Sequence, residues 1–146
     1  MSKPSGPGRI ALAELERRIG AGEVDTVISA ITDLQGRLMG KRMTGDYFRE
    51  HARQGTHFCT YLLGTDMEMR TPSGYRLMNW ETGYGDWLAD PDWDTLRVIP
   101  WLEKTALVLC DVRDEATGEL VPVAPRTLLR RQVERAQALG FAVVMA

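Results

Sequence analysis

The stretch that decides the fold is residues 24–43, VDTVISAITDLQGRLMGKRM. Its first part, 24–31, alternates apolar with small polar residues and is rich in β-branched side chains, which favours a half-buried strand. Residues 33–36 (DLQG) then supply turn chemistry, and 37–43 can return as a second strand. The stretch therefore predicts a β-hairpin.

Further strand patterns and short helices follow this hairpin. Residues 44–54 predict a short helix that presents Tyr47 and Phe48 to a core. A buried strand is expected at 57–63. Two more strands are expected, at 95–100 and 105–112. The second of these is nearly all apolar, so we expect a central strand that is covered on both faces.

Helical patterns mark both ends of the chain. Apolar residues at helical spacing predict an amphipathic helix over 10–19. The segment 125–139 (PRTLLRRQVERAQAL) predicts a longer helix, with proline in its first turn and Gly140 as its stop. Residues 1–8 are rich in Pro, Gly and Ser and predict a disordered leader. Residues 141–146 (FAVVMA) predict a strand.

These elements indicate an α+β fold, in which a mixed sheet packs with one or two helices. The expected organisation has three parts: a flexible leader and short helix at 1–22, the sheet domain at 23–122, and a helix and strand at 123–146. A terminal apolar strand without partners would be an exposed edge. We therefore expect residues 123–146 to begin a further, missing domain.

Composition and charge exclude several classes of protein. The chain is 44% hydrophobic and 26% charged, and its formal net charge of -2 gives no general attraction to nucleic acid. No apolar run approaches the roughly 20 residues that cross a bilayer, and the amino-terminal segment lacks the apolar core of a signal peptide. We therefore expect a cytoplasmic protein that has no nucleic-acid or membrane partner.

Most local motifs favour structural roles. A phosphate-binding G-x-x-x-x-G-K-[ST] motif is absent, and the basic run Arg37, Lys41 and Arg42 favours a solvated hairpin face, with contact to a phosphate or a neighbouring subunit as the alternative. The two histidines are six residues apart and have too few further ligands near them for a metal site, so they predict none and are expected to be structural or exposed. The two cysteines lie among apolar residues and are expected to be reduced core thiols: Cys59 and Cys110.

The segment 64–94 is long, lacks periodicity and is rich in Gly, Pro, Asp and Trp. Loops of this length are uncommon inside a compact domain unless they are functional or serve another surface. Its second half, 79–94 (NWETGYGDWLADPDWD), places three tryptophans among five carboxylates. Such aromatics either fasten the loop to its own domain or face a ligand or partner, and the carboxylates could hold a cation. The sequence leaves both interpretations open.

Several short motifs, taken in order, resemble the glutamine synthetase family. The first hairpin of that family is similar to 32–37 (TDLQGR) followed by 40–42 (GKR). The resemblance covers residue 24 to the end and continues through 90–92 (DPD), 95–97 (TLR), 100–101 (PW), 106–111 (ALVLCD), Pro125, Arg126 and Leu129. The sequence resembles more closely the branch that ligates glutamate to amines such as polyamines or ethanolamine. Ammonia-using members carry an Asp-Gly-Ser-Ser-type motif, which the loop of this chain lacks.

The resemblance implies a fold, a reaction and a site. The fold is a β-grasp-like domain whose loop reaches into the active site of the neighbouring subunit in a ring, a dodecamer in the full-length parent. The reaction is the phosphorylation of glutamate by ATP, followed by attack of ammonia or an amine on the γ-glutamyl phosphate. One loop carboxylate, Glu81 (favoured) or Asp66, would bind and deprotonate the amine, and Trp80 and Tyr84 would shape the pocket. ATP and Mg²⁺ or Mn²⁺ would be bound mainly by the missing carboxyl-terminal domain, so the chain alone is expected to be inactive.

Two other functions remain open. The chain could be a non-catalytic oligomerisation or regulatory module derived from this family, which would assemble by itself. It could also be an unrelated binding domain that uses the tryptophan-rich loop for a cationic ligand. In that case Glu81→Gln would weaken the binding of amines by the isolated chain.

Overall fold

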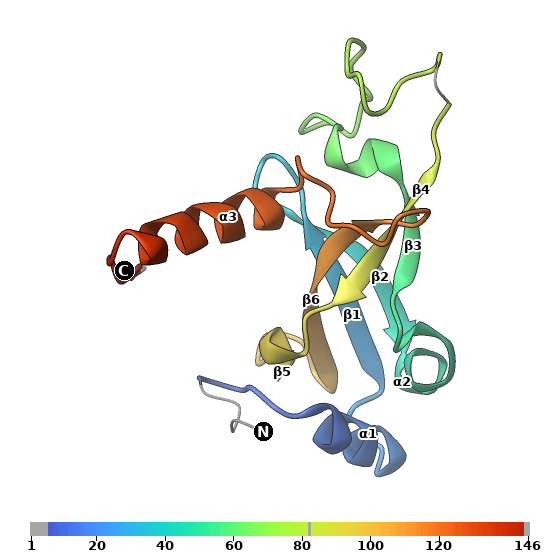
Figure 1. The fold of residues 1–146 in the computed structure, drawn as a ribbon. Coiled ribbons are helices and arrows are strands. Elements are labelled where there is room, and N and C mark those ends of the chain that lie inside the picture. Colours follow the sequence, from blue (N-terminus) through green and yellow to red (C-terminus); the bar gives the residue numbers. More distant parts are fainter. Residues whose placement is uncertain (1–5, 82, 145–146) are drawn as a thin grey trace.

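A computed structural model gives the structure of the protein at residues 6–81 and 83–144 (Figure 1). Its helices are α1 (Leu12–Gly20), α2 (Gly45–Tyr47), which continues as a π-helical turn (Phe48–Ala52), and α3 (Pro125–Ala138). Short 3₁₀ turns occupy Thr60–Leu63 and Trp93–Thr95. The strands are β1 (Thr26–Thr32), β2 (Leu38–Thr44), β3 (Thr56–Cys59), β4 (Asp86–Pro91), β5 (Arg97–Val98) and β6 (Thr105–Asp114). The mixed sheet and its few helices confirm the α+β fold class.

The sheet has the strand order β2-β1-β6-β4-β3, and β5 also pairs with β6. The pair β1–β6 is parallel, from Thr26 opposite Thr105 to Ala30 opposite Leu109, and the other pairs are antiparallel. The predicted hairpin is confirmed as β1–β2. Its strands approach closely at Gly40, where a Cβ atom would lie 2.0 Å from the carbonyl oxygen of Ser29. The hairpin therefore requires a residue without a side chain at this position.

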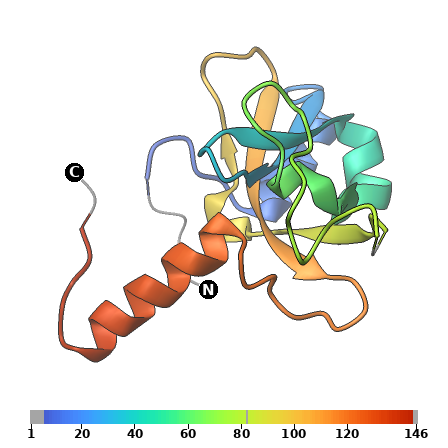
Figure 2. The same ribbon diagram turned by 90° about the horizontal axis from the view of Figure 1, so that it is seen from above.

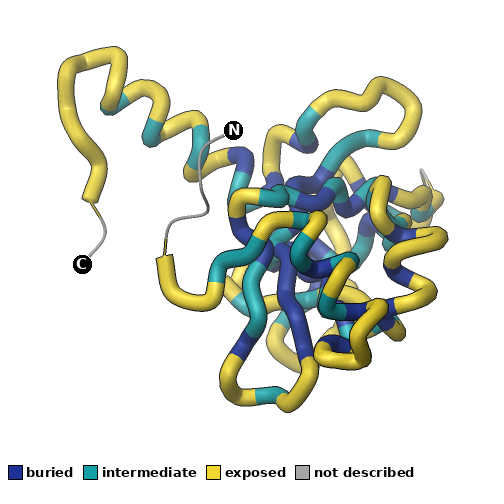
Figure 3. The backbone as a smooth tube through the Cα atoms, turned by 90° about the horizontal axis from the view of Figure 1, so that it is seen from below, coloured by how far each residue is buried: buried dark blue, intermediate teal, exposed yellow. Residues whose placement is uncertain are grey.

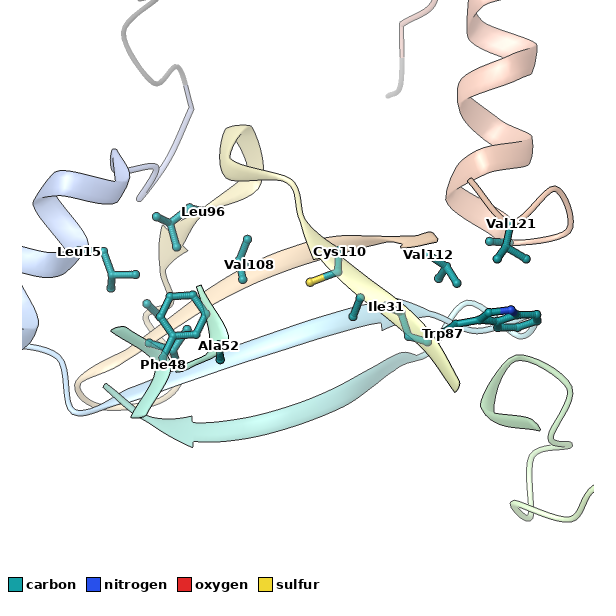
Figure 4. Close-up of a cluster of buried hydrophobic side chains, with 14 of the residues drawn as sticks. Leu15, Ile31, Phe48, Ala52, Trp87, Leu96, Val108, Cys110, Val112 and Val121 are labelled. Atoms are coloured by element: carbon teal, nitrogen blue, oxygen red, sulfur yellow. The ribbon is translucent and has the colours of Figure 1, made fainter. Parts of the chain in front are cut away.

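The main core lies between one face of the sheet and the helices α1 and α2 (Figure 4). Leu15 of α1, Phe48 and Val108 of β6 are fully buried in it. A smaller cluster on the opposite face joins Leu107 of β6 to Ala30 and to the turn after β5. Strand β6 is thus central and covered on both faces, as its apolar sequence predicts.

The expected burial of Tyr47 and the strands expected at 57–63 and 95–100 are wrong in detail. Tyr47 is exposed whereas Phe48 is buried, because consecutive residues of a helix point in different directions. The strand expected at 57–63 ends at Cys59, and the chain then turns into a 3₁₀ helix. Strand β3 pairs only with β4, so it is a half-buried edge strand rather than a buried one. The strand expected at 95–100 is reduced to β5.

The long loop is shorter than the sequence predicts, because its last part forms β4. Trp87, Ala89 and Pro91 are buried and alternate with more exposed residues, as expected for a strand with one face on the core. The residues between them are the apolar Leu88 and the acidic Asp90, so the sequence shows no regular alternation. The irregular segment is therefore residues 64–85, which is called the loop below.

Helix α3 is confirmed, with Pro125 in its first turn, and extends away from the sheet (Figure 2). Its first part is held by ion pairs from Arg126 to Asp92 and Asp111, and Leu128 and Leu129 on it are exposed. No strand forms at 141–144, which is exposed, and the last two residues of the predicted strand lie outside the described residues (Figure 3).

At the other end, most of the predicted leader also lies outside the described residues. The leader prediction is wrong at Gly8, whose carbonyl oxygen accepts a hydrogen bond of 3.0 Å from the backbone N–H of Val98 in β5. Helix α1 follows, as the amphipathic pattern predicts, and buries Leu15 and Ile19. The proposed division of the chain at residues 22 and 122 stays an expectation.

Candidate functional site

The loop begins near the turn of the β1–β2 hairpin (Figure 1). The Arg37 side chain joins the hairpin to the loop. The Arg37 guanidinium donates to the carbonyl oxygens of Asp66 and Met67, at 3.0 and 3.1 Å. Its Nε atom also lies 2.6 Å from the fully buried carboxylate of Asp33, which accepts backbone N–H groups of the hairpin turn. The expectation of a solvated basic face is therefore wrong for Arg37, although Lys41 and Arg42 are exposed.

Asp66, one of the two candidate carboxylates, shapes the base of the loop. Its Oδ1 atom accepts hydrogen bonds from the backbone N–H groups of Glu68 and Arg70, at 2.8 and 2.9 Å. Such a bond pattern is an Asx turn, in which the carboxylate replaces a backbone carbonyl. The structure thus gives the Asp66 carboxylate a role in holding the local backbone.

Trp80, Glu81 and Tyr84 lie together farther along the loop. The rings of Trp80 and Tyr84 meet nearly at right angles with 5.1 Å between centroids, and Tyr84 contacts Tyr61 of the 3₁₀ turn in the same way at 5.9 Å. Trp80 is nonetheless 81% exposed. The Glu81 backbone N–H donates to the side-chain oxygen of Asn79 at 2.9 Å, which fixes the turn that carries the carboxylate.

These three residues line one open cleft of about 380 Å³, which is called the loop cleft below. A carboxylate beside exposed aromatic rings suits an ammonium group, which is attracted by the charge and by the ring faces. Three of the four predicted site residues therefore share one cavity, and Asp66 is not among its lining residues. The full lining is Pro72, Ser73, Gly74, Tyr75, Arg76, Asn79, Trp80, Glu81 and Tyr84.

The other chemically interesting side chains have structural surroundings. Cys110 is buried with its Sγ atom 3.0 Å from the Ser29 hydroxyl, and burial raises the pKa of its thiol to about 11. Cys59 is only half-buried, so the prediction of core thiols is confirmed for Cys110 alone. The His51 and His57 side chains are exposed, and His57 lies 3.2 Å from Glu115.

The described parts of the chain contain neither a group of metal ligands nor a membrane-spanning helix. Over 6–81 and 83–144, no three His, Cys, Asp or Glu residues are grouped so that they could hold a metal ion. Within the same ranges, no helix has both the length and the apolar character needed to span a membrane.

The sequence analysis assigned Arg37 to a basic hairpin face and gave Arg76 no role, whereas in the structure Arg37 binds the loop and Arg76 lines the cleft. Arg37 follows Asp33 by four residues across a turn, which hints at their ion pair but not at the contact with the loop. Arg76 lies in the irregular segment and lines the loop cleft. No periodic pattern of the sequence could have indicated it.

Comparisons with known proteins agree with this fold. The chain is 42% identical over 133 residues to γ-glutamylethanolamide synthetase GlnA4 of Streptomyces coelicolor, which covers 90% of the chain and 29% of that protein. It is 37% identical over 119 residues to glutamate–isopropylamine ligase of a Pseudomonas species, and the match covers 81% of the chain and 26% of that ligase. It is 31% identical over 110 residues to type-1 glutamine synthetase 2 of Dictyostelium discoideum, and the match covers 75% of the chain and 21% of that protein.

The chain is a homologue of the glutamine-synthetase-like ligases. Its greater identity to the two amine ligases confirms the predicted nearness to that branch of the glutamine synthetase family. The solved structure of GmaS in complex with ADP superimposes with a TM-score of 0.62 at 25% identity, over 86% of the chain and 26% of GmaS. No protein-family model matches the chain. The chain spans less than a third of the length of these curated glutamine-synthetase-like relatives.

Proposed function

We propose that the natural polypeptide carrying this chain is an ATP-dependent ligase that joins glutamate to ammonia or a small amine. Residues 23–122 are its amino-terminal β-grasp-like domain, and residues 123–146 begin the next domain. The observation that carries this proposal is the 42% identity over 133 residues to a γ-glutamylethanolamide synthetase. The central parallel pair β1–β6, flanked by the antiparallel strands β2 and β4, supports the β-grasp-like description.

The reaction proceeds through phosphorylation of the glutamate side chain and attack of the amine on the γ-glutamyl phosphate. An amine is protonated near neutral pH and becomes a nucleophile only when it loses a proton. Glu81 attracts this cation and accepts the proton, while Trp80 and Tyr84 orient it through their ring faces. ATP supplies the phosphoryl group, and Mg²⁺ or Mn²⁺ offsets its charge; other parts of the protein hold both.

The loop serves a neighbouring subunit in a ring-shaped homo-oligomer, a dodecamer. Two features of the described residues support this role. The loop cleft is open, and Trp80 on its rim is largely exposed, as expected for an aromatic residue that a partner covers. The described lining of the cleft holds one carboxylate, Glu81, which fits a loop that supplies part of an active site.

Glu81→Gln tests which carboxylate receives the amine. In steady-state assays of ATP-dependent glutamate amidation by the natural polypeptide, this change removes the charge but keeps the shape. We expect kcat/KM for the amine to fall by about a hundredfold, while KM for ATP changes little. Asp86→Asn is the matched control, because Asp86 is exposed in β4 and does not line the cleft.

Asp66→Asn separates the second candidate from the first. Because an asparagine oxygen can still accept the two backbone N–H groups that Asp66 holds, Asp66→Asn should leave the loop in place and change the binding of ATP and glutamate little. An Asp66→Asn enzyme that loses only amine affinity, alongside an unaffected Glu81→Gln enzyme, would transfer the proposed role to Asp66. If neither change affects amine kinetics, the loop has no part in amine binding.

A further inference from the structure

The loop cleft contains two opposite charges that do not neutralise each other. Arg76 and Glu81, which are near each other in the sequence, both line it. In the part of the chain that the structure describes, neither side chain lies within ion-pairing distance of an oppositely charged group. By contrast, Arg70 elsewhere in the loop pairs with Glu68 at 2.6 Å. Among the described residues, the cleft lining is therefore dipolar: it holds one carboxylate, Glu81, and one guanidinium, Arg76, and neither is in a salt bridge.

A dipolar cleft selects a dipolar ligand. The guanidinium of Arg76 offers several fixed N–H donors, which bind hydroxyl or carboxylate oxygens well. The Arg76 guanidinium repels an ammonium group at the far end of the amine. A hydrocarbon end would cover the guanidinium without accepting a hydrogen bond from it. The volume of about 380 Å³ is at the small end of the range for ligand sites, so it suits a short molecule.

Resting on the ligase function proposed above, we propose that Arg76 is a specificity-determining residue of the loop cleft. The amine acceptor is a short primary amine that carries an oxygen acceptor, a hydroxyl or a carboxylate, at its far end. Its ammonium end lies at Glu81 and its oxygen end at Arg76. Diamines and polyamines are rejected because their second ammonium group would face the guanidinium.

The test compares three-carbon acceptors that differ only at the far end: aminopropanol, diaminopropane and propylamine. The natural polypeptide should use aminopropanol with a kcat/KM about tenfold higher than that for either of the others. Arg76→Ala should remove this preference. Arg76→Glu should reverse it in favour of diaminopropane, because a carboxylate then faces the second ammonium.

Three controls separate the effect of charge in the cleft from general effects on folding and activity. Arg70→Ala removes an exposed loop arginine that does not line the cleft, and it should leave the preference unchanged. Arg76 is itself exposed, so its substitution leaves the core intact, and thermal unfolding of each variant checks this. A replacement of Arg76 by lysine should keep the rejection of diaminopropane, since the charge remains.

The outcomes distinguish this inference from the function on which it rests. Ligase activity with the same acceptor preference in Arg76→Glu would overturn the role of Arg76 and leave the ligase function intact. A rise in KM for glutamate or ATP, without a change in acceptor preference, would also overturn it and assign Arg76 to the other substrates. Absence of ATP-dependent glutamate amidation with every amine would overturn both.

Discussion

Single residues at the base of the loop connect it to the sheet. Arg37 reaches from the hairpin turn to two loop carbonyl oxygens, and Asp33 beneath it is fully buried. Asp66 then holds the first turn of the loop through two backbone N–H groups. Side chains of the hairpin and of the loop therefore determine together where the cleft lies.

Arg37→Ala should loosen the loop without unfolding the sheet. Loss of the charge-assisted hydrogen bonds should raise the fraction of molecules with a detached loop about tenfold. Cleavage by trypsin after Arg70 and Arg76 should accelerate by the same factor. Mass spectrometry of timed digests measures the two cleavages. Arg42→Ala is the control, because Arg42 is an exposed residue of the same hairpin. Equal cleavage rates in both variants would mean that Arg37 does not hold the loop.

At the scale of elements, the strongest local patterns were predicted correctly. The β1–β2 hairpin, β6 and α3 each combine a clear period or apolar run with a turn or stop signal. Strand β4 was missed because acidic residues and a proline interrupt its apolar residues. Its burial comes from pairing with β3 and β6, which is a tertiary effect that a local pattern does not contain.

Gly40→Ala should destabilise the hairpin although it adds one methyl group to an exposed strand. The new Cβ would lie 2.0 Å from the Ser29 carbonyl oxygen, so β1 and β2 must separate. We expect the free energy of unfolding to fall by about 1–3 kcal/mol in urea titrations. Gly85→Ala is the matched control, since a Cβ there meets no atom within 4 Å. Similar stabilities of the two variants would contradict the close approach.

At the scale of the whole molecule, the candidate site was predicted in part. Trp80, Glu81 and Tyr84 are near in sequence, so their meeting in one cleft needed only a turn. The contact of Arg37 with the loop spans about 30 residues and depends on the finished sheet. Whether the predicted residues act on an amine stays a prediction, because neither the fold nor the relatives test it.

The attachment of α3 to the sheet is another long-range feature, and a substitution of Arg126 tests it. Arg126 joins α3 to Asp92 and to the nearly buried Asp111, with distances of 2.5 and 3.0 Å. Arg126→Ala should therefore lower the free energy of unfolding by about 1–3 kcal/mol and speed amide hydrogen exchange in α3. Arg135→Ala, on the exposed part of α3, should change neither. Unchanged exchange in Arg126→Ala would show that other contacts seat the helix.

The parallel pairing of β1 with β6 also governs the order in which the domain can be made. β1 is translated early, but Thr26 faces Thr105, so one edge of the hairpin has no partner until most of the chain has left the ribosome. Through that interval the nascent chain presents an open β1 edge, which is a template for wrong pairing with other chains. The strand that completes the sheet is thus also the one that ends this exposure during synthesis.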